Sequence, residues 1–226
     1  FENKQINIDA EMLKLNIFNN FSDEGKNVIS FLNSKIYTNY RIKDGTVLFN
    51  SDDSKIKNNI TEYSGELSVE PFNFNLNVDL GNYKLSKLLN FKSTLTEFVK
   101  TELFFNNNIS SNITIITKPK AKEEIFQNVK INFTIIDGQI NFNKTRLINN
   151  KIGSLELEKS NLFFDNDKLI LNMDVVIDID NTDKLFSLLQ TSKKSRKPVK
   201  NILINLNYYF TSNQFEFNNI KIDNKE

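Results

Sequence analysis

The segment from Phe72 to Leu80 alternates apolar and polar residues without a break: Phe72-Asn-Phe-Asn-Leu-Asn-Val-Asp-Leu80. Successive side chains of a β-strand point to opposite faces of a sheet, so this order puts Phe, Leu and Val on one face and Asn and Asp on the other. Similar alternation recurs at residues 131–142, 169–179, 202–210 and 215–217. The pattern is typical of antiparallel strands that keep one face away from water.

Composition and turn signals favour the same architecture. The chain has 37 Asn, 26 Ile and 20 Phe but only two Ala, and Ile and Phe favour strands whereas Ala is the best helix former. Asp44-Gly45 and Asp137-Gly138 separate alternating runs, and such dipeptides favour hairpin turns because both central residues need positive φ. We therefore predict a mainly β chain whose repeated antiparallel strands form a curved, elongated sheet or groove.

Two segments depart from the alternation. Tyr83–Phe105 and Asn181–Thr191 carry Leu and Phe near the spacing of an amphipathic helix, and Thr94 followed by Glu97 resembles a helix capping box. Each segment directly follows a long alternating strand. We predict two short amphipathic helical segments at these places.

The order of the elements also repeats along the chain. The run Asp44-Gly-Thr-Val-Leu-Phe-Asn50 resembles Asp137-Gly-Gln-Ile-Asn-Phe-Asn143, and a Gly-containing loop, a long strand and a helical segment follow each. We predict approximate repeats at 30–105 and 125–192, with a truncated third repeat at 198–226. Such units stack side by side because one unit alone cannot bury its apolar face. Since the chain begins at Phe1 instead of Met, we also expect residues 1–226 to be a segment of a larger repeat protein.

The composition excludes several functional classes. The chain contains no His and no Cys, which excludes a histidine base, a thiolate nucleophile, a disulfide and the common zinc sites. A net charge of +1 gives no general attraction to nucleic acid, so we expect no nucleic-acid partner. Asp174, Asp178 and Asp180 lie on the polar side of one predicted strand and lack the Gly-bearing loop of a calcium site. We predict a non-enzymatic protein without a cofactor or a metal.

One concentrated basic run occurs at Lys193-Lys-Ser-Arg-Lys197. It could attract anionic lipid head groups, at about 1 kcal/mol for each charge near such a surface. The alternative, which the sequence favours, is a solvated loop that follows a helix.

Two passages resemble the bacterial AsmA-like family, including its AsmA-like C-terminal and DUF3971-type members. They are the hairpin Val129–Phe142 with Ile152–Leu157 after it, and the strand-then-helix passage from Ser64 to Leu89. The resemblance extends over roughly residues 30 to 226. It implies a long periplasmic groove of repeated antiparallel strands, anchored in the inner membrane in the full-length protein, whose apolar concave face conducts phospholipid toward the outer membrane.

The resemblance also implies the partners. These are phospholipid acyl chains and neighbouring repeats of the full-length chain, with membrane contact only through parts absent from this sequence. The residues that we expect to face the groove or a core share the apolar side of three predicted strands: Phe72, Phe74, Leu76, Phe133, Ile135, Leu171, Met173 and Val175.

An apolar trough binds an acyl chain without polar recognition, since each buried methylene contributes about 0.8 kcal/mol. The alternative is a structural or adhesive β-sandwich module of a cell-surface protein. In that case two sheets would close over the same residues at a separation of about 10 Å. The alternation alone does not separate an open groove from a closed core.

Overall fold

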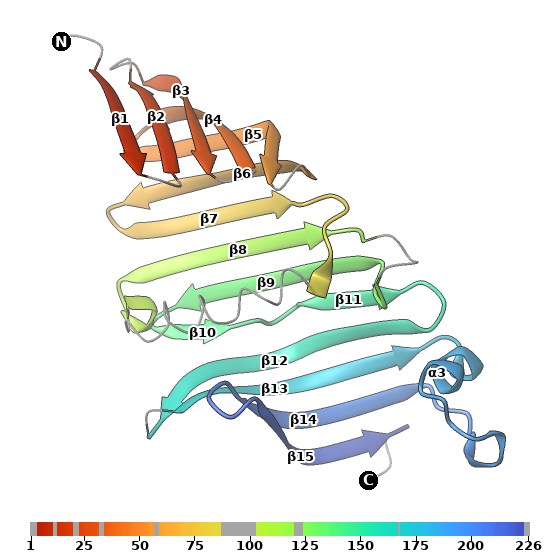
Figure 1. Ribbon diagram of the computed structural model, residues 1–226. Coiled ribbons are helices and arrows are strands. Elements are labelled where there is room, and N and C mark those ends of the chain that lie inside the picture. Colours follow the sequence, from red (N-terminus) through yellow and green to blue (C-terminus); the bar gives the residue numbers. More distant parts are fainter. Residues whose placement is uncertain are drawn as a thin grey trace.

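All described strands of the protein belong to one sheet (Figure 1). The computed structural model describes residues 4–10, 13–19, 23–31, 34–56, 59–86, 103–119, 124–166 and 168–223. Fifteen strands lie in this part of the chain, and their spatial order follows the sequence from β1 to β15, except that β10 and β11 share a place between β9 and β12. The strands are β1 (Lys4–Ala10), β2 (Leu13–Asn19), β3 (Glu24–Phe31), β4 (Ser34–Lys43), β5 (Thr46–Ile56), β6 (Asn59–Val69), β7 (Phe72–Asp79), β8 (Ile109–Thr117), β9 (Asn128–Ile136), β10 (Gln139–Asn141), β11 (Arg146–Asn149), β12 (Gly153–Asp165), β13 (Lys168–Ile179), β14 (Asn201–Tyr209) and β15 (Gln214–Ile222).

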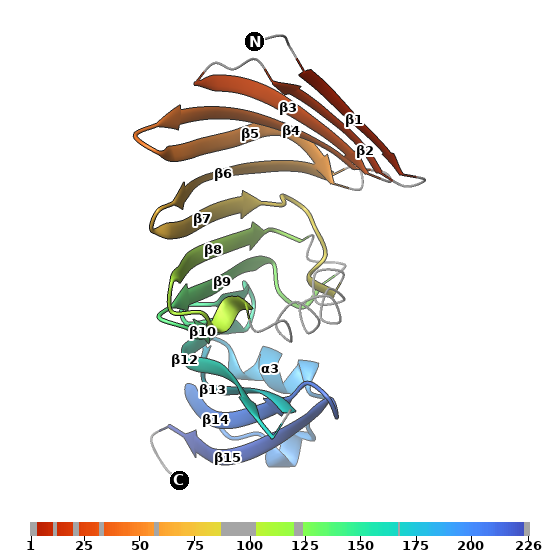
Figure 2. The ribbon, with the colours of Figure 1, turned by 90° about the vertical axis from the view of Figure 1, so that its left-hand side faces the viewer.

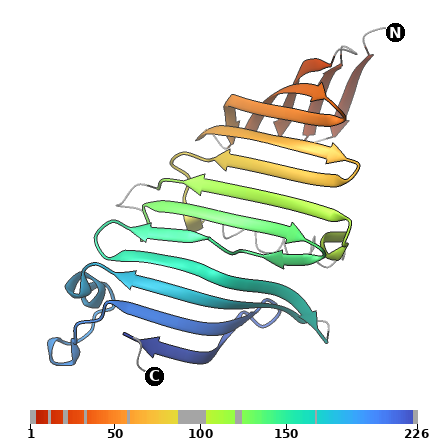
Figure 3. The ribbon, with the colours of Figure 1, turned by 180° about the vertical axis from the view of Figure 1, so that it is seen from behind.

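The sheet is elongated and curved. The N-terminal strands form one end and the C-terminal strands the other, and the view turned by 90° shows the curvature of the strands (Figure 2). Seen from behind, the strands again follow one another as a single ladder (Figure 3). The prediction of a mainly β, curved and elongated sheet is confirmed. No second sheet faces it among the described strands, so they do not form the two layers of a β-sandwich.

The two Asp-Gly pairs form tight hairpin turns as predicted. Asp44 and Gly45 have φ of 49° and 73°, and Asp137 and Gly138 have φ of 50° and 69°. In both hairpins the residues that flank the Asp-Gly pair lie directly opposite each other, as Lys43 and Thr46 do in the β4–β5 hairpin. Gly supplies the second positive φ at little steric cost, which is why these dipeptides set the register of the flanking strands.

One strand pair, β7 with β8, is parallel, whereas the alternating pattern predicts antiparallel strands. Parallel neighbours need a connection that returns the chain to the starting end, and residues 80–108 make this connection. A buried hydroxyl group links the first part of this connection to the end of β8 by hydrogen bonds. Thr117 Oγ1 donates to the carbonyl oxygen of Tyr83 at 2.6 Å and accepts from the Tyr83 amide at 3.1 Å.

The second predicted helical segment contains the helix α3 (Thr182–Leu188). Asn181 caps it, because its side-chain oxygen accepts a hydrogen bond from the Lys184 amide at 3.0 Å. The first predicted helical segment, Tyr83–Phe105, lies mostly outside the described residues. Its last residues form a short 3-10 helix, η1 (Leu103–Phe105), and a second one, η2 (Lys193–Ser195), follows α3.

The predicted repeats at 30–105, 125–192 and 198–226 stay a prediction. The chain continues differently after the long strands of the first two units: β7 is followed by a parallel neighbour and β13 by an antiparallel one. α3 and its flanking loops return the chain to the end of the sheet at which β13 ends.

Candidate functional site

The eight predicted residues lie on one face of the sheet, which we call the apolar face. Strand register carries a continuous row of residues across this face, because directly opposed residues in neighbouring strands point to the same side. The row passes through Ile42, Val47, Leu67, Phe74, Ser111, Ile135, Ile140, Leu162, Leu171, Tyr208 and Phe215. Phe74, Ile135 and Leu171, predicted from three separate runs, therefore share one row from β4 to β15.

The other five predicted residues flank this row on the same strands. Leu76 lies opposite Ile113 of β8, which in turn lies opposite Phe133 of β9. Met173 and Val175 of β13 lie opposite Leu206 and Ile204 of β14. Phe72 begins β7 and is opposite Val69 of β6. The register thus assembles the predicted set into one surface.

Burial divides the apolar face into two parts. In β9–β14, which we call the covered part, Ile135 is 1% exposed and Met173 and Val175 are also buried. In β4–β8, the open part, Phe74 and Leu76 are only half-buried and Phe72 is 39% exposed. The predicted residues of the covered part are thus buried or pack against buried residues, whereas those of the open part are half-buried or exposed.

Aromatic residues of η1 cover the buried cluster around Ile135 in the covered part. The ring of Phe104 lies 6.1 Å from that of Phe133, and the ring of Phe105 lies 5.6 Å from that of Phe164, measured between centroids. Both pack against the buried cluster of Ile135, Ile140, Leu162 and Leu169. The sequence pattern does not indicate Phe104 and Phe105 as site residues, because they belong to a non-alternating segment whose place over the sheet follows only from the fold.

Leu171 connects the two buried clusters of the covered part. It packs against the cluster around Ile135 and also against the cluster of Met173, Val175 and Leu206. Phe72, Phe74 and Leu76 belong to neither cluster. The five C-terminal residues of the predicted set therefore belong to packed apolar clusters. The three N-terminal residues, Phe72, Phe74 and Leu76, are related to the rest of the set only through the register of the strands.

Flat aromatic rings form the surface of the open part. A side chain at Gly65 would meet the Phe49 ring, whose Cζ atom lies 2.5 Å from the position of an added Cβ. Phe49 stacks on Phe74, with centroids 6.1 Å apart and planes inclined by 15°. Tyr40 covers Gly25 in the same way. Rings that lie over strand glycines present a low, continuous apolar surface.

On the opposite face, Asn side chains form hydrogen bonds between neighbouring strands. Asn172 donates to Asn207 at 2.7 Å, and the two residues are directly opposed. Asn205 donates to Asp174 at 2.6 Å, and Asn201 to Asp178 at 2.8 Å. These acceptor roles account for two of the acidic residues considered for calcium. Among the described residues no group of His, Cys, Asp and Glu is arranged to hold a metal ion.

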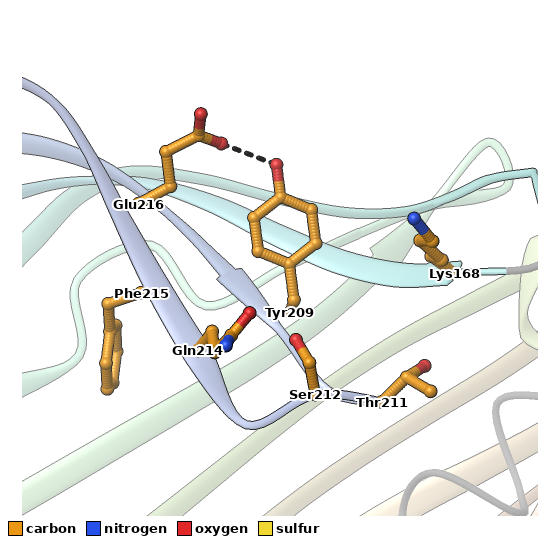
Figure 4. A pocket seen from close by; sticks show the side chains of 7 residues that line it. All are labelled: Lys168, Tyr209, Thr211, Ser212, Gln214, Phe215 and Glu216. Atoms are coloured by element: carbon orange, nitrogen blue, oxygen red, sulfur yellow. Dashed lines mark hydrogen bonds between the residues drawn. The ribbon is translucent and has the colours of Figure 1, made fainter.

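A polar depression lies on this opposite face beside the β14–β15 hairpin (Figure 4). The Tyr209 hydroxyl donates to Glu216 at 2.5 Å, and Lys168 and Gln214 contribute to the lining. This hydrogen bond raises the pKa of Tyr209 above 10.0 and lowers the pKa of Glu216 below 4.5. Both groups lie at the surface, and their hydrogen bond links the two strands of the hairpin.

The basic run lies in the loop after α3. Lys193 and Lys194 are exposed on η2, while Arg196 donates from Nε to the carbonyl oxygen of Thr191 at 3.1 Å. This contact holds Arg196 against its own loop. It does not decide whether the basic run attracts anionic lipid head groups or is only a solvated loop. No helix in the described part of the chain is long and apolar enough to span a bilayer.

Comparison of the chain with known protein families, with curated proteins and with solved structures gives no match.

Proposed function

We propose that the chain is a segment of an AsmA-like envelope protein and that its apolar face binds phospholipid acyl chains. In this proposal the full-length protein is anchored in the inner membrane, lies in the periplasm and conducts lipid toward the outer membrane without catalysis. The observation that supports it most is the apolar row that crosses the sheet from β4 to β15, because its members on β4–β7 stay only partly buried.

The dimensions and chemistry of the open part suit an acyl chain. Neighbouring strands lie about 4.8 Å apart, so the four intervals from β4 to β8 span about 19 Å, more than the roughly 15 Å thickness of one leaflet's hydrocarbon layer. Burial of about ten methylenes would contribute about 8 kcal/mol before the costs of association are subtracted. Phe49, Phe74 and Leu76 would provide this contact without hydrogen bonds to the lipid.

A pair of adjacent substitutions in β7 tests the proposal. Leu76→Asp places a carboxylate on the apolar face, whereas Asn77→Asp places the same charge one residue away on the opposite face. Native mass spectrometry of the purified chain should detect bound phospholipid in the wild type and in Asn77→Asp. Leu76→Asp should lose it, because a charge without a partner is costly to bury under an acyl chain.

Binding of a fluorescent phospholipid from detergent provides a second measurement on the same three proteins, with circular dichroism as the check that each is folded. Absence of lipid from the wild type in both measurements would refute the proposal. Equal binding by Leu76→Asp and Asn77→Asp would also refute it, because the apolar face would then have no part in binding.

A further inference from the structure

The segment from Thr182 to Lys200, which we call the α3 loop, projects from the sheet beyond the end of β13 (Figures 1 and 3). It contains α3, η2 and the basic run. Its two ends are held together, because the Thr182 hydroxyl group donates to the Val199 carbonyl oxygen at 2.9 Å and accepts from the Val199 amide at 3.4 Å. β13 is paired on both sides, with β12 and with β14, so the loop follows an interior strand of the sheet.

Hydrogen bonds within the α3 loop give it a defined shape. The Thr191 amide donates to the Phe186 carbonyl oxygen at 2.9 Å and turns the chain after α3. The hydroxyl groups of Ser192 and Ser195 are hydrogen-bonded at 3.0 Å across η2, and Arg196 is held against Thr191. The loop therefore presents its side chains from a folded surface.

α3 carries apolar side chains that the sheet does not bury. No residue of the helix is buried, and Leu185 and Phe186 are only half-buried. Leu188 and Leu189, at its C-terminal end, are 48% and 62% exposed. The apolar side of a surface helix normally packs against protein. Exposed leucines beside a lysine-rich surface are typical of segments that lie in the interface of a bilayer.

The positive charge of the chain is concentrated in the same loop. Residues 182–200 contain six of its 29 Lys and Arg residues but only one, Asp183, of its 28 Asp and Glu residues. The rest of the chain therefore has 23 basic and 27 acidic residues, a formal net charge of −4. Lys193, Lys194 and Lys197 are exposed and form no ion pair with another described residue. An anionic surface would attract this loop and repel the remainder of the chain, which orients the molecule.

We propose that the α3 loop is a docking site for an anionic lipid bilayer. Leu188 and Leu189 enter the head-group region, and the lysines of the basic run lie against the lipid phosphates. A nucleic acid or an acidic protein segment would neutralise the charge but would leave both leucines in water. The docking site goes beyond the proposed function, in which membrane contact occurs through parts absent from this sequence, and it does not depend on acyl-chain binding by the apolar face.

Co-sedimentation with vesicles tests the contribution of charge. The wild-type chain should bind vesicles of phosphatidylglycerol and phosphatidylcholine in equal parts, and should bind vesicles of phosphatidylcholine alone much more weakly. The triple variant Lys193→Gln/Lys194→Gln/Lys197→Gln should weaken binding to the anionic vesicles about hundredfold, from about fivefold for each charge. Added salt should weaken wild-type binding as well, because it screens the lysines.

A matched control removes the same charge from the sheet. The variant Lys43→Gln/Lys130→Gln/Lys159→Gln loses three exposed lysines of β4, β9 and β12 and should bind the anionic vesicles nearly as tightly as the wild type. Leu76→Asp, which disrupts the apolar face, should also bind them. Circular dichroism of all variants verifies that the sheet is folded.

Tryptophan fluorescence tests the insertion of the leucines, since the chain has no Trp of its own. The emission of Leu189→Trp should shift to shorter wavelength when anionic vesicles are added, because the indole ring moves from water into the head-group region. Ile125→Trp places the same reporter at a residue that is 54% exposed outside the α3 loop, and its emission should not shift.

Several results would overturn the docking site. They are a wild type that does not bind anionic vesicles or that binds phosphatidylcholine vesicles equally well, equal weakening by the two triple lysine variants, and an unshifted emission of vesicle-bound Leu189→Trp. Loss of vesicle binding by Leu76→Asp would also overturn it, because the apolar face would then be the contact. Absence of bound phospholipid in native mass spectrometry, with vesicle binding intact, would refute the proposed function alone.

Discussion

Phe74 of β7 and Ile135 of β9 occupy the same row of the apolar face, with Ser111 of β8 between them, yet they differ in burial. Phe74 is half-buried in the open part, whereas Ile135 is 1% exposed in the covered part. Both come from equally regular alternating segments. The difference shows that alternation assigns a residue to a face, while segments outside the alternation, here Phe104 and Phe105, decide whether that face becomes core.

The largest expected effect comes from a matched pair of leucine truncations. Leu162→Ala in the covered part should lower the free energy of unfolding by about 2–5 kcal/mol, because Leu162 is 1% exposed and its removal leaves a cavity. Leu67→Ala in the open part should cost clearly less, since water already reaches that half-buried side chain. Urea unfolding followed by circular dichroism measures both. Equal losses would contradict the division into two parts.

Truncation of the covering ring should make the covered part resemble the open part. Phe105→Ala should cost about 1–3 kcal/mol of stability, a reduced form of the full Phe→Ala penalty because Phe105 is only half-buried. It should also increase binding of a fluorescent apolar dye by uncovering the cluster around Ile135. Phe72→Ala in the open part serves as the matched control and should decrease dye binding instead. Unchanged dye binding by Phe105→Ala would show that η1 is not the cover.

A side chain at Gly65 should disturb the open part alone. In Gly65→Ala the new methyl group would displace the Phe49 ring and crowd the Asn75 carbonyl, at a cost of about 1–3 kcal/mol. Gly45→Ala is the control, because nothing lies within 4 Å of its Cβ position and only its positive φ of 73° is unfavourable. Thermal unfolding should rank Gly65→Ala below Gly45→Ala in stability. The reverse order would mean that Gly65 is not closely packed against the Asn75 carbonyl and the Phe49 ring.

The smallest expected effect concerns the surface hydrogen bond between Tyr209 and Glu216. Because the folded state lowers the pKa of Glu216 and raises that of Tyr209, this bond stabilises the sheet above pH 4.5 and below pH 10.0. The contribution is lost as pH falls through the folded pKa of Glu216 or rises through that of Tyr209. The melting temperature of Tyr209→Phe should lie slightly below that of the wild type at pH 7, and the difference should narrow as the pH is lowered through the acid range where Glu216 becomes protonated. A difference that grows as the pH is lowered would contradict this assignment.

Much of the local structure could be predicted from the sequence. The alternating runs at 72–80, 131–142, 169–179 and 202–210 lie largely in strands, and the hairpin turns at Asp44-Gly45 and Asp137-Gly138 occur as expected. The parallel pairing of β7 with β8 was not predicted, because alternation has no direction along the chain. The contribution of η1 was not predicted either, since its contacts join residues that are distant in sequence.

The sequence by itself determined which side of each strand is apolar, because side chains of an extended backbone alternate with a period of two regardless of what surrounds them. It also determined the two tight turns, through the backbone freedom of Gly45 and Gly138. Only the tertiary structure decided that the separate apolar sides join into one row, since that depends on the register between strands. It also decided which part of the row is buried, because Phe104 and Phe105 reach Ile135 only through the fold of the whole sheet.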